Sequence, residues 1–204
     1  MEEQEYYPIP HQNIRYLRLK RTLDLLFSFL LLIFLLLPMG VIALSVALTS
    51  RGGVLFRQTR IGRDGAPFTC LKFRTMVKSA PPNRPSAGFD DVGQYLTPVG
   101  RFLRKTSLDE LPQLWNVLRG DMSLVGPRPL IGEEEDVHRV RRENGVYRVR
   151  PGMTGLAQIH GRDRLANDEK AAYDIRYVST LSLREDLRII AKSLGCVLSG
   201  ENAK

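Results

Sequence analysis

Two adjacent carboxylates, Asp109 and Glu110, are the side chains best suited to chemistry, because cationic residues lie close before them. Arg104 and Lys105 belong to the same segment. A carboxylate can attack phosphorus to form an acyl phosphate, while neighbouring Arg and Lys side chains offset the charge of a phosphate ester. The segment therefore favours a nucleophile that acts on an anionic phosphate substrate.

The same segment also has a purely structural interpretation. Residues 107–110 match a capping box, with Ser107 as the N-cap and Glu110 reaching back to it. Asp109 would then complement the positive end of the helix. Pro112 fits better in a first turn that Asp109 itself caps. Both interpretations stay open and are compatible, because a helix N-terminus is also an anion site.

Two short apolar segments, 54–58 and 67–73, predict a β-hairpin around the turn residues 62–65. On the second strand Lys72 and Arg74 share one face. This pair of cations fits a phosphate cradle, and an ordinary solvated face has the same pattern.

Arg128 lies between Pro127 and Pro129, which restrict the backbone on both sides of it. A pre-positioned guanidinium suits bidentate phosphate binding, and a surface turn with an exposed arginine has the same sequence. Residues 150–155 read as a turn, and Arg162 is exposed in another turn.

The run from Leu25 to Leu48 carries no charge and forms a helix of roughly 36 Å. That length crosses a hydrocarbon core of about 30 Å, so a single transmembrane helix is the simplest interpretation. Pro38 would kink this helix, and both flanks are basic. A re-entrant helix that returns to the same face explains both facts, and a kinked span stays open as the alternative. Asp24, at the start of the run, reads as a snorkelling or first-turn acid.

The chain of 204 residues has a formal charge of +8, which indicates anionic partners such as phospholipid headgroups, nucleotides or nucleic acid. Its two cysteines, Cys70 and Cys196, show no CxxC spacing and read as buried, inert thiols. The histidines are scattered and indicate no metal cluster.

Three further segments have clear patterns. The Pro- and Gly-rich stretch at about 78–93 predicts a mobile loop, either a lid or a connector. Residues 133–144 form a charge-rich helix with a solvated face, to which no chemistry is assigned. Residues 181–198 predict a helix that either packs in the core through Leu183, Leu187 and Leu194 or lies in a membrane interface.

Together these segments resemble the bacterial sugar transferase family, the small monotopic phosphoglycosyl transferases such as the one that starts bacterial N-glycan synthesis. The resemblance extends from about Leu23 to Ser199, in the family's order. Relatives often carry a small polar residue before the bending proline, where this chain has Leu37. The matching segments are the Pro38-bent run, Gln58–Gly62, Lys72–Met76, Ser107–Gln113, Trp115–Ser123, Gly126–Leu130, Arg150–Gly152, Thr154–Gln158 and Gly161–Arg162.

The resemblance implies transfer of a sugar-1-phosphate from a UDP-sugar to undecaprenyl phosphate, with release of UMP. Asp109 would be the nucleophile and would contact Mg2+, and Glu110 would be its partner. The alternative is a membrane-tethered binding or assembly protein without catalysis. The implied substrate-binding residues are Lys72, Arg74, Arg104, Pro127, Arg128, Pro129 and Arg162.

The expected architecture is α+β, with a basic segment at 1–22, a re-entrant membrane helix at 23–50 bent near Pro38, and a catalytic domain at 51–204. The domain is expected to be mostly helical, with a short β-hairpin and interfacial amphipathic helices. The resemblance places it on the cytoplasmic face of the bacterial inner membrane, with both termini cytosolic. Membrane lipids and downstream glycosyltransferases are expected partners, nucleic acid is not, and the chain is expected to be the minimal catalytic form.

Overall fold

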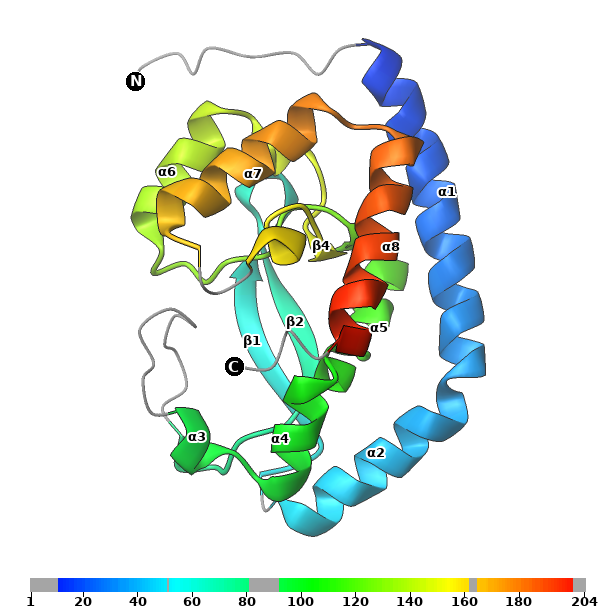
Figure 1. Ribbon diagram of the computed structural model, residues 1–204, viewed down its shortest axis with the longest axis vertical. Helices are drawn as coiled ribbons and strands as arrows, with labels where there is room; N and C mark the ends of the chain where they lie inside the picture. Colours follow the sequence, from blue (N-terminus) through cyan, green and yellow to red (C-terminus); the bar gives the residue numbers. More distant parts are fainter. Residues whose placement is uncertain (1–10, 51, 81–91, 162–164, 200–204) are drawn as a thin grey trace.

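The computed structural model describes residues 11–50, 52–80, 92–161 and 165–199. Figure 1 shows helices arranged around a β-hairpin, with α1 and α2 along one edge of the molecule. The predicted α+β class, mostly helical with a short hairpin, is confirmed. The helices are α1 (His11–Phe34), α2 (Leu36–Thr49), α3 (Val92–Tyr95), α4 (Pro98–Lys105), α5 (Gln113–Arg119), α6 (Glu135–Glu143), α7 (Asn167–Ser179) and α8 (Leu183–Ser199), and the strands are β1 (Leu55–Ile61), β2 (Pro67–Phe73), β3 (Ser123–Val125) and β4 (Gly152–Thr154).

The apolar run forms two helices that meet at a sharp bend. The helices α1 and α2 are bent by 64° at Leu35, the residue between them. Pro38 lies in the first turn of α2 and has no N–H to donate to the Phe34 carbonyl, so the bend falls one turn before the proline. None of the described helices alone is long and apolar enough to cross a membrane, whereas this bent pair together meets that requirement.

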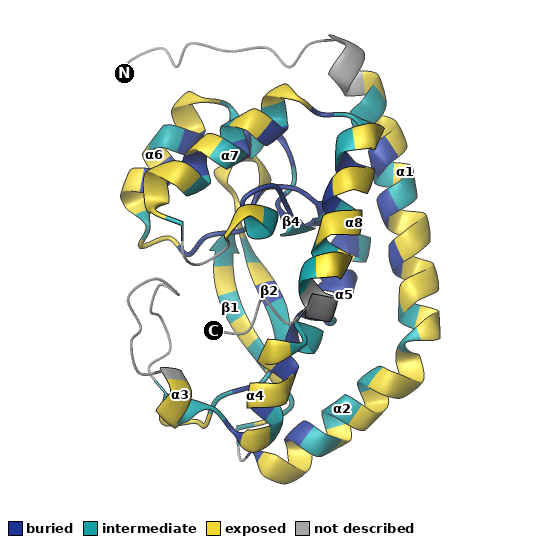
Figure 2. Cartoon of the chain, viewed as in Figure 1, coloured by how far each residue is buried: buried dark blue, intermediate teal, exposed yellow. Residues whose placement is uncertain are grey.

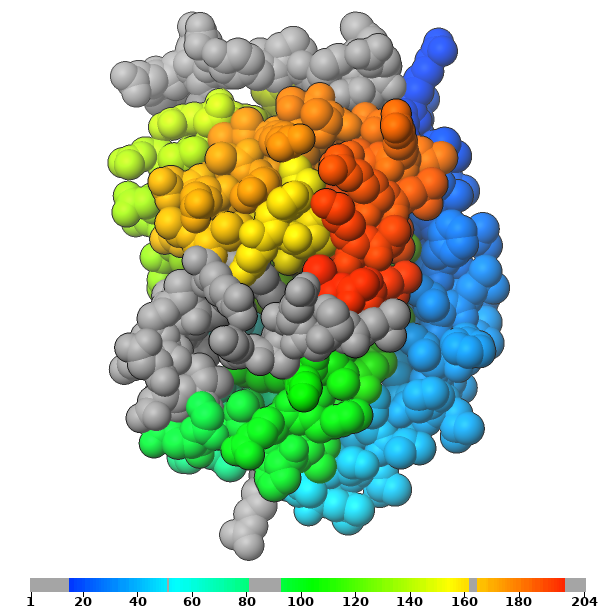
Figure 3. Space-filling model, in the orientation of Figure 1, coloured from blue at the N-terminus to red at the C-terminus, as the bar shows by residue number. Residues whose placement is uncertain are grey.

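The outer surface of the bent pair is apolar and exposed. Figure 2 shows that the lower part of α1 and most of α2 turn exposed residues outward, and in Figure 3 the two helices form one continuous edge. Phe34 and Leu37, on either side of the bend, are each 79% exposed. By contrast, Lys20, Asp24 and Ser28 in α1 are buried against the rest of the molecule. An apolar surface of this extent marks an interaction site.

The predicted hairpin is confirmed. Strands β1 and β2 are antiparallel, with Leu55 opposite Phe73 and Ile61 opposite Pro67. The turn includes Asp64 in the left-handed region at φ 57°, a conformation that Asp tolerates better than most residues. Of the loop expected at about 78–93, residues 81–91 lie outside the described residues.

A parallel pair of short strands, β3 and β4, crosses the centre of the domain, where the sequence predicted only a turn at 150–155. Glycine residues allow the two strands to approach each other this closely. A Cβ on Gly152 would lie 2.0 Å from Gly126 N, and one on Gly126 would lie 2.5 Å from the carbonyl oxygen of Arg150. These glycines therefore serve the close packing of two backbones.

The core lies where α7 and α8 pack against β3, with Val125, Tyr177 and Ile189 fully buried. The apolar stripe predicted for α8 does not fill this core. Leu187 and Leu194 are exposed, because the helix turns the Ile189 face inward instead. Of the two interpretations of that stripe, core packing is wrong for these two residues and for Leu183, which is also exposed.

Candidate active site

The two carboxylates lie in a single 3-10 turn between α4 and α5. This turn, Leu108–Glu110, follows Ser107, whose left-handed φ of 56° is unusual for a residue with a side chain. The expected capping box is wrong, because Ser107 makes no side-chain cap and α5 begins only after Pro112. Proline fits the start of a helix and not its interior, so the dyad is held in a turn of its own.

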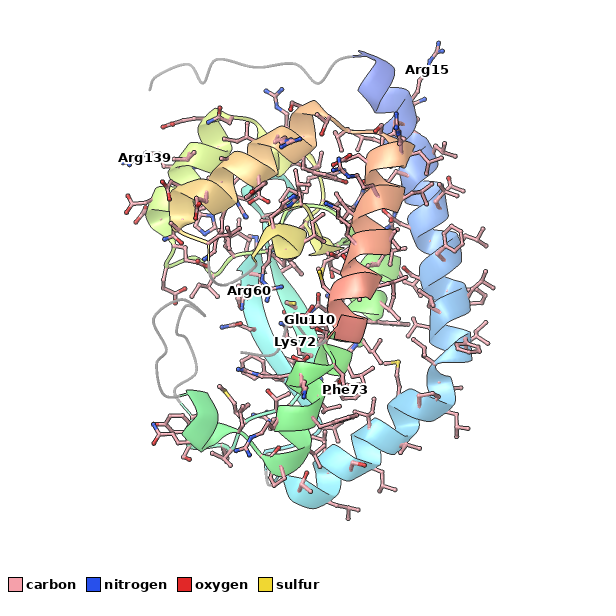
Figure 4. All side chains as sticks on the ribbon, viewed as in Figure 1. Arg15, Arg60, Lys72, Phe73, Glu110 and Arg139 are labelled. Carbon is pink, nitrogen blue, oxygen red and sulfur yellow. The ribbon has the colours of Figure 1, made fainter. Side chains whose placement is uncertain are left out.

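Both carboxylates are nearly enclosed, with Asp109 7% and Glu110 8% exposed. Buried charges require partners, and Glu110 has two cationic ones. Lys72 Nζ donates to Glu110 Oε1 at 2.8 Å, and Arg128 Nη2 lies 3.5 Å from the same oxygen. Figure 4 shows Lys72 and Glu110 together in front of the hairpin. Strand β2, the dyad turn and the loop after β3 therefore meet at one carboxylate.

Asn116 holds helix α5, which follows the dyad turn, against strand β2, and the sequence did not indicate this. Its Oδ1 accepts from Leu71 N at 3.0 Å, and its Nδ2 donates to Thr69 O at 2.7 Å. Asn116 is fully buried, so these bonds fix the position of α5 relative to the strand that carries Lys72. The one feature of the sequence that could have indicated this role is an amide side chain, next to Val117, in a mostly apolar helix.

Not every predicted site residue joins this cluster. Arg74 lies beyond the end of β2 and donates to the carbonyl oxygens of Gly53 and Leu55, so it does not form the expected cradle with Lys72. Arg104 donates from Nε to Thr75 Oγ1 at 3.1 Å. Pro127 and Pro129 are buried on either side of Arg128. Arg162 lies outside the described residues.

A second arginine, Arg60, adds to the positive charge near the dyad. It donates to Gln58 Oε1 from Nε and Nη2, and to Pro129 O from Nη1 at 3.1 Å. Burial lowers the pKa of Arg60, and the charge of Arg128 lowers it further. Burial also raises the pKa of the Cys70 thiol, as expected of an inert cysteine, whereas Cys196 is partly exposed. Arginine and lysine side chains gathered around buried carboxylates are an arrangement suited to phosphate.

The comparisons with known proteins agree with this chemistry. Residues 15–200 match the model of the family described as "Bacterial sugar transferase". A "UDP-galactose-lipid carrier transferase" of Erwinia amylovora is 42% identical in an alignment 202 residues long that covers 91% of this chain and 41% of that protein. A "UDP-glucose:undecaprenyl-phosphate glucose-1-phosphate transferase" of Caulobacter vibrioides is 44% identical over 192 residues, 90% of this chain and 71% of that protein. An "Uncharacterized sugar transferase EpsL" of Bacillus subtilis is 40% identical, with 90% of this chain and 89% of that protein covered. The chain thus spans less than half of the Erwinia relative and most of the Bacillus one. It belongs to the bacterial sugar transferase family.

Proposed function

We propose that this chain is a phosphoglycosyl transferase that moves a sugar-1-phosphate from a UDP-sugar to undecaprenyl phosphate and releases UMP. The observation that carries the proposal is the enclosed Asp109–Glu110 turn, with Lys72 and Arg128 gathered at Glu110. The names of the relatives support the donor and acceptor classes.

Catalysis takes place in two displacements on Asp109. In the first, a carboxylate oxygen of Asp109 bonds to the phosphorus nearest the sugar, and the bond from that phosphorus to the UMP oxygen breaks. In the second, a phosphate oxygen of the lipid bonds to the same phosphorus, and the Asp109 carboxylate leaves with its electron pair. Lys72 and Arg128 offset the phosphate charge in both steps, while Glu110 orients them and takes up the acceptor proton.

The dyad also fits Mg2+. This ion is usually bound through one or two carboxylates together with substrate phosphates and water. Across the described parts of the chain no three Asp, Glu, His or Cys side chains are grouped as ligands, so the protein would supply Asp109 and the substrate most of the rest. When bound, Mg2+ would neutralise charge on the diphosphate leaving group.

The bent helix pair serves as a re-entrant membrane anchor on the cytoplasmic face of the inner membrane, with both termini cytosolic. The 64° bend and the exposed apolar surface around it support this topology. On α8, Leu187 and Leu194 are exposed beside Arg184 and Arg188, as in a helix that lies in the interface of an anionic membrane. Cysteine labelling from either side of sealed vesicles tests the topology. A terminus on the periplasmic side would indicate a single transmembrane helix instead of a re-entrant one.

The decisive experiment measures UMP release by membrane-embedded protein given undecaprenyl phosphate, Mg2+ and a panel of UDP-sugars. Release with one donor is expected, with a loss of about 1,000-fold or more in Asp109→Asn, as when a catalytic nucleophile is removed. Asp136→Asn, on the exposed face of α6, is the matched control and should keep full activity.

Two outcomes of this experiment would contradict the proposal. Full activity in Asp109→Asn would reject Asp109 as the nucleophile. If folded protein released no UMP with any donor of the panel, a binding or assembly role would be favoured. Mass spectrometry of protein incubated with donor alone gives an independent readout, because a covalent sugar phosphate on the peptide containing Asp109 is expected.

A further inference from the structure

Four consecutive main-chain carbonyls around Arg128 are each held by a donor from elsewhere in the chain. The Pro127 oxygen accepts from Gly152 N at 2.9 Å, and the Leu130 oxygen accepts from Ile61 N at 2.9 Å. The two carbonyls between them are held by arginine side chains. Arg141 Nη1 donates to the Arg128 oxygen at 2.9 Å, and Arg60 Nη1 donates to the Pro129 oxygen at 3.1 Å.

Arg141 reaches this loop from α6 and is buried together with one carboxylate. Its Nη2 donates to Asp174 Oδ2 on α7, and the two residues are 2% and 1% exposed. Among the described residues, Arg141 Nε and Asp174 Oδ1 have no hydrogen-bond partner. Burial raises the pKa of the Asp174 carboxyl, and the charge of Arg141 offsets only part of that effect. A buried, incompletely bonded ion pair is a poor source of stability, so its presence calls for another role.

We propose that Arg141, oriented by Asp174, is a positioning residue that directs Arg128 toward Glu110, and that Arg60 secures the other side of the same loop. The inference rests on the proposed function in one respect, namely that Arg128 acts on the phosphate substrate. Neither Arg60 nor Arg141 is assigned a contact with the substrate.

The geometry explains how a contact to a main-chain oxygen sets the direction of a side chain. The rings of Pro127 and Pro129 fix φ at those residues, and the two carbonyl contacts fix the peptide planes that follow Arg128 and Pro129. With the backbone held, the Arg128 side chain leaves the loop in one direction, with Nη2 3.5 Å from Glu110 Oε1. A guanidinium ordered in advance loses less entropy when it binds phosphate.

A double-mutant cycle separates positioning from a general structural role. The variant Arg141→Met/Asp174→Leu removes both buried charges together and should keep the fold. We expect its kcat/KM to fall about tenfold, the effect of losing one orienting hydrogen bond. When Arg128 is also replaced by Ala, the same two changes should cost nothing further, because there is no guanidinium left to direct. Equal losses with and without Arg128 would overturn the proposal.

Two further variants serve as a conservative replacement of Arg141 and as a control. Arg141→Lys keeps a charge beside Asp174, but a single ammonium group cannot reproduce the planar fork that holds both partners, so a similar loss is expected. Arg139→Met, on the exposed side of α6 and far from the dyad in Figure 4, should match the wild type. Wild-type kcat/KM in both Arg141→Lys and the double variant would overturn the proposal.

Amide hydrogen exchange of the full-length protein tests the loop without any substrate. The peptide that contains residues 126–131 should exchange faster in Arg141→Met/Asp174→Leu and unchanged in Arg139→Met. Unchanged exchange in both variants would overturn the positioning role. If the wild type has no transferase activity, the proposed function fails while the exchange result still decides whether Arg141 holds this loop.

Discussion

Two carboxylates in this molecule are each paired with a lysine, yet their surroundings differ. Glu110 lies 2.8 Å from Lys72 Nζ, and Asp186 lies 2.6 Å from Lys20 Nζ. The Lys72 side chain is 20% exposed, whereas that of Lys20 is 9% exposed. The Glu110 cluster (below, the open cluster) is therefore more exposed to solvent than the Asp186 cluster (below, the closed cluster).

The partners of the two carboxylates differ as well. Besides Lys20, Asp186 accepts from Tyr16 at 2.5 Å and from Tyr177 at 2.8 Å, so hydroxyl groups complete its coordination. Glu110 is faced by a second cation, Arg128, at 3.5 Å. Phenol hydroxyls and a lysine therefore surround one carboxylate in the Asp186 cluster, whereas two cations face one carboxylate at Glu110, as the proposed phosphate site requires.

The largest effect is expected when the closed cluster is broken. Asp186→Ala leaves Lys20 buried without its main counter-charge, which should lower the free energy of unfolding by about 3–5 kcal/mol. Denaturant unfolding in detergent micelles measures this change. A loss below about 1 kcal/mol would show that water or Asp24 replaces the missing carboxylate and that the cluster is not an anchor.

The open cluster should respond in the opposite way. Lys72→Met is expected to lower kcat/KM by about 100-fold, because one charge at the phosphate is lost. Its unfolding free energy should fall by less than in Asp186→Ala, since Arg128 still faces Glu110. Steady-state UMP release and unfolding are measured on the same preparation. A variant that loses stability and keeps its rate would place Lys72 among the anchors.

A smaller effect is expected at the edge of the closed cluster. Tyr177→Phe removes the donor to Asp186 and Val125 O and should cost about 1–2 kcal/mol, with the rate unchanged. Burial raises the pKa of Tyr177 well above its ordinary value, so the folded state favours the protonated phenol. This stabilisation is full below the unfolded value of about 10 and is lost as pH rises toward the folded pKa. The cost of Tyr177→Phe should therefore shrink above pH of about 10; a constant cost would contradict the shift.

The smallest effect is expected at an exposed pair in the hairpin turn. Asp64→Asn removes the charge that faces Arg63 at 3.0 Å, and both side chains are well exposed. Asn also accepts the left-handed backbone of residue 64, so the unfolding free energy should change by less than about 0.5 kcal/mol. Thermal unfolding of Asp64→Asn and of the wild type, measured side by side, checks this expectation. A larger loss would mean that exposure is a poor guide to the value of an ion pair here.

Local patterns predicted local structure well. Alternating apolar residues with a glycine-containing turn indicated the hairpin, and Pro38 indicated the bend, because both depend on neighbours in the sequence. The capping box at Ser107 failed for a related reason. Four residues matched the motif, but the proline two positions later set where the helix begins.

Contacts between distant residues could not be predicted in this way. Asp24 was interpreted as a snorkelling acid, yet it accepts from Ser123 Oγ at 2.7 Å and Leu124 N at 3.1 Å. Arg141 lies in a helix interpreted as solvated, and its partners are 13 and 33 residues away. A sequence of charges does not show which of them a tertiary fold will enclose.

The position of Asp24 and Lys20 on α1 limits how a soluble form of this protein can be made. Deleting the first fifty residues would remove the apolar helices, but it would also uncover Asp186, Ser123 and the amide of Leu124. Such a fragment is expected to aggregate or unfold. Polar substitutions at outward positions around the bend, such as Phe34 and Leu37, leave the inner half of α1 in place and are the more promising route to crystals and assays without detergent.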